Sequence, residues 1–280
     1  MAQARLRGRG GTAAAPPAGV ALLSVCALRG GRDAEIRASA ETLRAVQESV
    51  LANPARGTEK RKAAKKMNRT KIEWTDYTWN PVTGCLRGCE YCYARKISAR
   101  YNRSFEPTFH EDRLQEPLKI KKPSRIFVCS MGELFASWAE RAWQEAVIET
   151  VRQCPQHIFQ FLTKSPKNLK NLNPWPRNAW VGATATDQIQ FDAAVAGLVE
   201  IDAVVKFISF EPLLSEIEVK LEKIDWVIIG AQTNPNRQPQ ANWVQKIIDE
   251  ADRHNVPVFL KPNLIWPKVR REFPSNQLCT

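Results

Sequence analysis

Three cysteines lie within eight residues of this 280-residue chain, at Cys85, Cys89 and Cys92. The whole chain contains only seven cysteines, so chance would place such a triplet in roughly one chain in two hundred of this length. Thiols this close in sequence usually either bind a metal or form disulfides. Because an odd total fits a disulfide framework poorly, we expect these three to bind a metal.

The amino-terminal region carries no convincing export signal. An apolar stretch over 20–28 is followed by Arg29, Gly30, Gly31, Arg32 and Asp33 rather than by a small-residue cleavage site. This stretch is also too short to span a bilayer. We therefore expect a soluble cytoplasmic protein with reduced thiols and no membrane association.

The number of cysteine ligands bears on which metal they bind. A closed structural zinc site needs four protein ligands, and the nearest histidine, His110, lies eighteen residues beyond Cys92. Three thiolates on a cubic iron–sulfur cluster would leave one iron open to a small molecule. The triplet therefore favours a 4Fe-4S cluster on Cys85, Cys89 and Cys92, while zinc and a metal-free loop remain alternatives.

Positive charge is concentrated in the first quarter of the chain. The net charge is +12, and residues 1–66 contribute thirteen Lys/Arg against five Asp/Glu. This segment opens with Ala, Arg, Gly and Pro, so we expect a disordered basic extension over 1–66 with one amphipathic helix over 34–51. Its run "EKRKAAKKM" is either a nucleic-acid contact or a solvated linker. Met67 is an alternative start of the working protein.

After Met67, short apolar runs alternate with segments of helical period. Nearly continuous apolar runs are typical of parallel strands covered by helices. Alternation repeated about six times predicts an α/β fold, either a β/α barrel or a doubly wound sheet. The expected strands are 77–82, 125–130, 158–163, 179–183, 206–210, 225–230 and 256–260, and the expected helices are 92–102, 139–154, 188–200 and 241–254.

Polar residues follow the ends of these predicted strands. In both architectures active sites form at the carboxyl ends of the strands, and the cysteine triplet directly follows the first one. The candidate catalytic residues are Glu211, Lys164, Lys261 and Arg237, with Asp187 and Gln232 in equivalent positions. Any one of them could be an ordinary solvated loop residue, so the prediction depends on their convergence.

The Cys-x3-Cys-x2-Cys spacing, with Tyr91 directly before the last cysteine, resembles the signature of the radical S-adenosylmethionine superfamily. That resemblance implies a partial (β/α)6-type barrel, expected here over 67–270 with a flexible tail over 271–280. It also implies a 4Fe-4S cluster and S-adenosyl-L-methionine, which the reduced cluster cleaves to methionine and a 5′-deoxyadenosyl radical. The radical abstracts hydrogen from a substrate, and an electron donor such as flavodoxin or ferredoxin reduces the cluster.

The same resemblance suggests residues that bind the cofactor. Met131, Gly132 and Glu133 resemble the superfamily's Gly-Gly-Glu element, which holds the methionyl amine. The alternative is an ordinary helix start capped by Ser130. Tyr91 also belongs to the expected cofactor-binding set. Thr184 completes it, since its hydroxyl could hydrogen-bond the ribose of an adenosine; the alternative is an ordinary loop threonine.

A narrower resemblance covers most of the chain from Thr70. The segments "IEWTDYTWNPVTGC", "CYARK", "SMGELF", "FLTKSP", "WVGATA", "FEPLL" and "DWVIIG" occur in order. Together they resemble a phage- and prophage-associated family of radical-SAM-like proteins with an unknown substrate. Residues 230–234 and 261–264 depart from that family's usual sequence, so its contacts in those two loops are not carried over.

Two other functions remain open on these residues. The first is a metal-stabilised nucleic-acid-binding protein of phage type without radical chemistry, and the second is a cluster-based electron carrier. Nucleic acid is also one candidate substrate for the enzyme itself, although residues 67–280 carry a net charge of only +4.

Overall fold

A computed structural model describes residues 67–233 and 235–275. The expected basic extension over 1–66, including the helix predicted over 34–51, lies outside the described residues. So do residues 276–280, the end of the expected tail. Within the described ranges, every helix is too short or too polar to cross a membrane.

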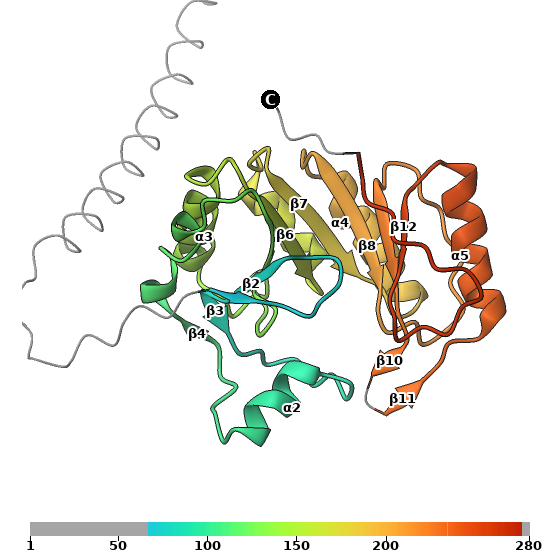
Figure 1. Ribbon diagram of the computed structural model, residues 1–280, viewed down its shortest axis with the longest axis horizontal. Coiled ribbons are helices and arrows are strands. Elements are labelled where there is room, and N and C mark those ends of the chain that lie inside the picture. Colours follow the sequence, from blue (N-terminus) through green and yellow to red (C-terminus); the bar gives the residue numbers. More distant parts are fainter. Residues whose placement is uncertain (1–66, 234, 276–280) are drawn as a thin grey trace, which may run out of the picture. The chain divides into compact units, whose positions relative to one another are not determined.

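An eight-stranded sheet organises the described chain (Figure 1). Seven of its strands are parallel and follow one another in chain order, and a short antiparallel strand is added at one edge. In sheet order the strands are β1 (Asn68–Arg69), β2 (Tyr77–Trp79), β5 (Arg125–Val128), β6 (Ile158–Thr163), β7 (Ala179–Thr184), β8 (Val205–Phe210), β9 (Trp226–Ile229) and β12 (Val258–Leu260).

Burial explains the apolar composition of the central strands. All six residues of β7 are buried, as are five of six in β6 and in β8. A strand covered on both faces must be apolar at nearly every position, because neither face is exposed to water. The α/β class with a parallel sheet is therefore confirmed.

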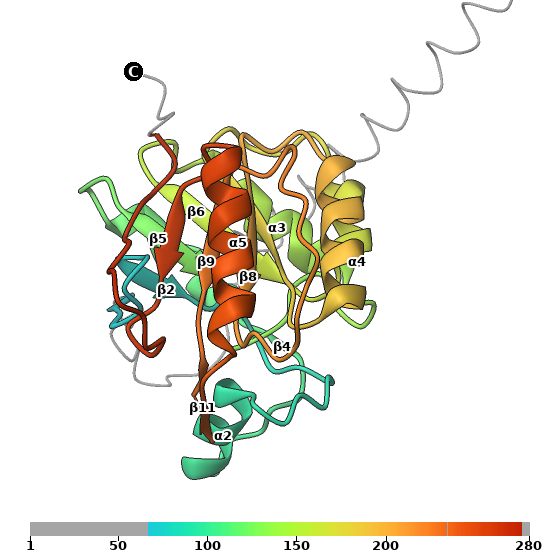
Figure 2. The same cartoon turned by 90° about the vertical axis from the view of Figure 1, so that its right-hand side faces the viewer.

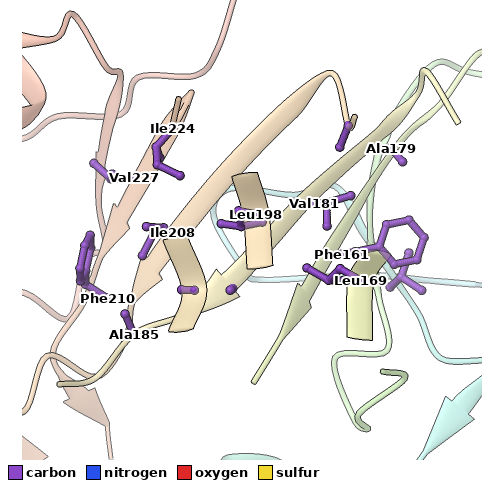
Figure 3. Packing of buried hydrophobic residues seen from close by; sticks show 14 of the residues in the cluster. Phe161, Leu169, Ala179, Val181, Ala185, Leu198, Ile208, Phe210, Ile224 and Val227 are labelled. Atoms are coloured by element: carbon purple, nitrogen blue, oxygen red, sulfur yellow. The ribbon is translucent and has the colours of Figure 1, made fainter. Parts of the chain in front are cut away.

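Helices cover one face of the sheet (Figure 2). They are α3 (Arg141–Arg152), α4 (Gln188–Val199) and α5 (Ala241–Arg253). In Figure 3, Leu198 of α4 lies over Val181 of β7 and Ile208 of β8. Burying an aliphatic side chain of this size contributes about 1.5–3 kcal/mol, so this interface is a main source of stability.

Two strand connections lack the α-helix that a regular (β/α)6 pattern would have. Between β6 and β7 the chain forms the 3₁₀ helix η3 (Pro166–Leu172), and the connection from β8 to β9 contains no helix. Proline in a helix interior removes a backbone donor and clashes with the preceding turn. Pro174 and Pro176 stand where a longer helix after η3 would continue.

The other face of the sheet is filled by aromatic side chains. This second cluster contains Trp74, Phe127, Trp180, Phe207, Trp226 and Phe259. Phe273 packs 5.4 Å from both Trp226 and Phe259, and Arg271 pairs with Phe259 in an antiparallel bridge. Residues 271–273, expected to begin a flexible tail, thus pack against β12 and its neighbours.

The expected first strand, 77–82, is interrupted after Trp79. Its last part becomes β3 (Val82–Thr83), which pairs with β4 (Thr108–Phe109) outside the main sheet. Because β3 and β4 are hydrogen-bonded neighbours, they hold together the two ends of the segment 84–107. That segment contains the three cysteines.

Candidate functional site

The cysteine segment is fixed to the end of β5 by backbone hydrogen bonds. Gly84 N–H donates to the carbonyl of Met131 at 2.9 Å, and Glu133 N–H donates to the carbonyl of Gly84 at 3.3 Å. Farther along, Cys85 N–H donates to the carbonyl of Phe105 at 3.0 Å. The first cysteine is therefore placed by its main chain.

Two arginines hold the rest of the cysteine loop. Arg87 donates to the carbonyl of Lys164 at 2.6 Å and to the hydroxyl of Ser165 at 2.8 Å, which connects the loop to the end of β6. Arg95 donates back to the carbonyls of Cys85 and Arg87 at 2.8 and 2.9 Å. These four hydrogen bonds connect the loop to itself and to the end of β6.

Gly84 occupies a position that no other residue fits. Its φ of +86° lies in the region that L-residues rarely adopt. A Cβ there would also lie 2.1 Å from the backbone oxygen of Glu106. Gly88, in the same loop, has a negative φ, and a Cβ added to it would meet no atom within 4 Å.

We expect Gly84→Ala to distort the loop at its first cysteine and to destabilise the protein by about 3 kcal/mol, because backbone strain and a backbone clash add. Gly88→Ala is the matched control and should change stability by no more than about 0.5 kcal/mol. Urea unfolding and iron content after reconstitution would measure both effects. Equal stability and iron content in the two variants would contradict the assignment.

A cavity of about 450 Å³ opens at the carboxyl ends of the parallel strands. Its wall includes the cysteine loop and residues at or just after the ends of β5, β6, β7, β8, β9 and β12. The sequence candidates that line it are Cys85, Cys89, Cys92, Tyr91, Gly132, Glu133, Lys164, Thr184, Glu211, Gln232 and Lys261.

Three of the sequence candidates lie elsewhere. Arg237 is exposed on β11 (Asn236–Arg237), which pairs with β10 (Gln232–Thr233). Asp187 is the N-cap of α4, where its carboxylate accepts from Gln190 N–H at 2.9 Å. Met131 contributes its main chain to the anchoring of Gly84 and does not line the cavity.

The sulfur atoms of the cysteine loop accept backbone hydrogen bonds. Cys92 is the N-cap of α2 (Tyr93–Arg100), and its Sγ accepts from Arg95 N–H at 3.4 Å. Sγ of Cys85 accepts from Arg87 N–H, also at 3.4 Å. Hydrogen bonds to cysteine sulfur are one of the means by which proteins tune iron–sulfur clusters. The donor set therefore fits such a cluster.

Burial raises the pKa of the Cys85 thiol. A backbone hydrogen bond from Arg87 lowers this pKa, while the negative charges of Glu133, Cys89 and Cys92 raise it further.

Within 67–233 and 235–275, no three His, Cys, Asp or Glu side chains surround a point where one metal ion would sit. Each cysteine of a cubic cluster binds a different iron atom, so its sulfurs need not converge on one point.

Glu133 uses its side chain within the protein. One carboxylate oxygen accepts from Thr163 Oγ1 at 2.7 Å and from Phe135 N–H at 3.1 Å, while the other accepts from Lys164 N–H at 2.9 Å. The residue is 6% exposed. No helix begins at Ser130, since α3 starts at Arg141, so Glu133 is a cross-link between the ends of β5 and β6.

Glu211 and Lys261 form an ion pair in the cavity wall, with Lys261 Nζ 2.5 Å from Glu211 Oε1. They come from the ends of β8 and β12, so the pair spans the ends of three neighbouring strands.

Tyr93 also belongs to the cavity wall, and its hydroxyl donates to the carbonyl of Ser130. Burial of this hydroxyl raises the Tyr93 pKa, and the charge of Glu211 adds to the shift, so the phenol is neutral.

Lys164 places a cation beside the cysteine loop. Its Nζ lies 5.6 Å from the centroid of the Tyr91 ring. Burial lowers the pKa of Lys164, while the nearby charges of Cys89 and Glu133 oppose that shift. Burial raises the pKa of Tyr91 to about 12, with the charge of Cys89 as the next cause.

Several cavity residues are absent from the sequence candidates. Cys129 lies inside an expected strand, where a free cysteine usually only packs, yet it lines the cavity as well as being buried, and burial raises its pKa to about 12. Arg87, Tyr93, Trp74 and Phe127 also belong to the wall, the last two forming an apolar part of it. The position of Cys129 near the end of its strand could have identified it, but nothing local in the sequence indicates the other four.

Comparison with solved structures finds spore photoproduct lyase at low similarity. A variant with bound AdoMet and dinucleoside spore photoproduct is 11% identical, with a TM-score of 0.44, over 69% of this chain and 65% of that one. The enzyme complexed with dinucleoside spore photoproduct is 10% identical, with a TM-score of 0.43 and the same coverage. The chain thus spans about 65% of the length of these two proteins. No curated protein sequence matches it.

Residues 69–273 match a family described as "Protein of unknown function (DUF5131)". The matched range covers the entire sheet from Arg69 onward, the cysteine loop and the cavity wall. The chain therefore belongs to the DUF5131 family.

Proposed function

We propose that this protein is an iron–sulfur enzyme of the radical S-adenosylmethionine type, which acts on a substrate of unknown identity. The observation that carries the proposal is the position of Cys85, Cys89 and Cys92. They lie on one loop after the first parallel strand and line a cavity at the carboxyl ends of the strands. Cofactor and substrate sites of parallel α/β proteins form at this edge.

Cys85, Cys89 and Cys92 would hold a 4Fe-4S cluster. When bound, the cluster supplies the electron that cleaves S-adenosylmethionine to methionine and a 5′-deoxyadenosyl radical. Lys164 offsets negative charge beside Cys89. Trp74 and Phe127 keep part of the cavity apolar, which excludes water from reactive species.

The ion pair of Glu211 and Lys261 gives the cavity a fixed polar wall. Because the two side chains neutralise each other, they can orient a polar substrate through hydrogen bonds without adding net charge. Glu133 acts through Thr163 and Lys164, so we assign it to positioning the end of β6.

The cavity favours an enzyme over a simple electron carrier. A carrier needs its cluster close to the surface, but it has no need for a space of about 450 Å³ beside the cluster ligands. Pockets of about 300–1,000 Å³ are typical of sites that bind small molecules and cofactors. The cavity is therefore the feature that separates these two functions.

Anaerobic reconstitution with iron and sulfide, followed by dithionite and S-adenosylmethionine, tests the proposal. We expect a brown protein that releases 5′-deoxyadenosine, measured by liquid chromatography and mass spectrometry. A brown protein that is reduced reversibly and leaves S-adenosylmethionine intact would instead identify an electron carrier. A colourless protein that binds zinc would contradict both.

A further inference from the structure

The helix that follows the cysteines has an unusual amount of exposed surface. Within α2 only Ala94 and Ser98 are buried. Ile97 and the C-cap residue Tyr101 are four residues apart, so they lie on one face of the helix, next to Tyr93, whose hydroxyl reaches the cavity wall. Tyr93, Ile97 and Tyr101 are 44%, 39% and 61% exposed, and Leu86 of the cysteine loop is 52% exposed.

The segment that carries these exposed apolar residues is rich in basic residues. Residues 85–105 contain five Lys/Arg and one Asp/Glu, a net charge of +4. Residues 67–280 as a whole contain 28 Lys/Arg and 24 Asp/Glu, which also gives +4. The rest of this part of the chain is therefore balanced, and its entire excess of positive charge lies on the cysteine loop and α2.

Arg100 and Arg103 supply exposed charge to this surface. In the described part of the chain, neither forms an ion pair, and the Arg103 guanidinium lies 5.3 Å from the centroid of the Tyr101 ring. Arg87 and Arg95 differ, because backbone carbonyls of the loop and of Lys164 already engage them. Figure 1 shows α2 projecting from the edge of the sheet, away from α3, α4 and α5.

We propose that the exposed face of α2 and the adjoining cysteine loop is the docking surface for an acidic one-electron carrier protein. Three observations support this occupant. The local charge of +4 complements an acidic surface. Ile97 and Leu86 are exposed aliphatic side chains in the same short basic segment, and exposed apolar side chains flanked by charged ones are typical of a protein–protein interface. α2 begins directly after Cys92, so a protein seated on it touches the loop that carries the cluster ligands.

A nucleic acid is the competing occupant. Single-stranded nucleic acids bind where basic residues alternate with aromatic rings on which bases stack. Here Tyr101 could serve as such a platform, but the exposed aliphatic side chains of Ile97 and Leu86 could not. These two aliphatic residues therefore favour a protein partner.

This inference rests on the proposed function, because only a cluster-containing enzyme needs the electron. In the transfer, the reduced carrier loses one electron and the oxidised cluster gains it. No proton or atom is exchanged between the two proteins. Dithionite, a small reductant, delivers the same electron without docking, so the two proposals can be tested separately.

The test uses the reconstituted full-length protein and two probes, reduced flavodoxin and a reduced 2Fe-2S ferredoxin. The variant is Arg100→Glu with Arg103→Glu. The matched control is Lys121→Glu with Lys122→Glu, which makes the same change in charge. Lys121 and Lys122 are exposed, have no ion pair in the described residues, and precede β5 at the end of the sheet away from the cavity.

We expect at least one carrier to bind the wild-type protein with an affinity that falls as salt rises. The α2 variant should bind about ten-fold or more weakly, and the control should bind normally. Rapid-mixing absorbance should show slower cluster reduction by the carrier in the α2 variant only. Dithionite-driven formation of 5′-deoxyadenosine should be unchanged in both, which shows that the fold and site are intact.

Several outcomes would overturn the docking surface. These are failure of both carriers to bind, equal binding by all three proteins, or loss of single-stranded oligonucleotide binding alone in the α2 variant. The last outcome would assign the surface to nucleic acid. Absence of 5′-deoxyadenosine with dithionite would instead refute the proposed enzyme activity, and it would leave the binding measurements valid on their own.

Discussion

Replacement of Cys89 by alanine is expected to abolish both the brown colour of the reconstituted protein and the release of 5′-deoxyadenosine. Cys89 is the middle cysteine of the loop and lines the cavity with Cys85 and Cys92. With two thiolates left, the loop cannot hold three corners of a cubic cluster. Iron and sulfide analysis, absorbance and product analysis would each detect the loss.

Cys154→Ala is the matched control for this substitution. Cys154 is 1% exposed and packs in the main core, and it does not line the cavity. Its loss should cost about 1 kcal/mol of stability through the removed sulfur, with no effect on iron content. If Cys89→Ala retained full iron and colour, the three-cysteine site would be wrong.

Replacement of Glu133 by alanine is expected to destabilise the protein by about 3–5 kcal/mol. The substitution leaves three donors without their acceptor: Thr163 Oγ1, Phe135 N–H and Lys164 N–H. Each unsatisfied buried donor costs about 1–3 kcal/mol. Urea unfolding of the protein would measure the change in the free energy of unfolding.

Glu145→Ala provides the comparison for Glu133. Glu145 is about half exposed and pairs with Arg141 one helical turn away, and such surface pairs contribute little. We expect a change within about 0.5 kcal/mol. Measuring both stability and S-adenosylmethionine binding separates two roles of Glu133. If Glu133→Ala kept its stability but lost S-adenosylmethionine binding, Glu133 would contact the cofactor directly instead of positioning the end of β6.

Much of the sheet could be predicted because parallel strands leave a local signature. The runs at 158–163, 179–183 and 206–210 correspond to β6, β7 and β8 within one residue at each end. Their side chains are apolar at nearly every position since both faces are covered. The interruption at Asn80–Pro81 was not predicted, because whether a strand continues depends on pairing partners far along the chain. Thr83 pairs with Thr108, for example.

The candidate site was predicted unevenly for a similar reason. Lys164, Glu211 and Lys261 line the cavity as their positions after strands suggested, but Arg237 belongs to a separate two-stranded hairpin and is exposed. Only the fold places Lys261 against Glu211, which are fifty residues apart in sequence.

The sequence by itself determined the class of fold, and it predicted the three thiols of the proposed cluster site. Three thiols at fixed spacing, and apolar runs of strand length alternating with helical periods, are local properties that each segment carries with it. The tertiary structure decided how these parts are used: that Glu133 is a cross-link, that Arg87 fastens the cysteine loop to β6, and that α2 stays exposed. These contacts join residues that are far apart in the sequence, so a pattern of neighbouring residues cannot predict them.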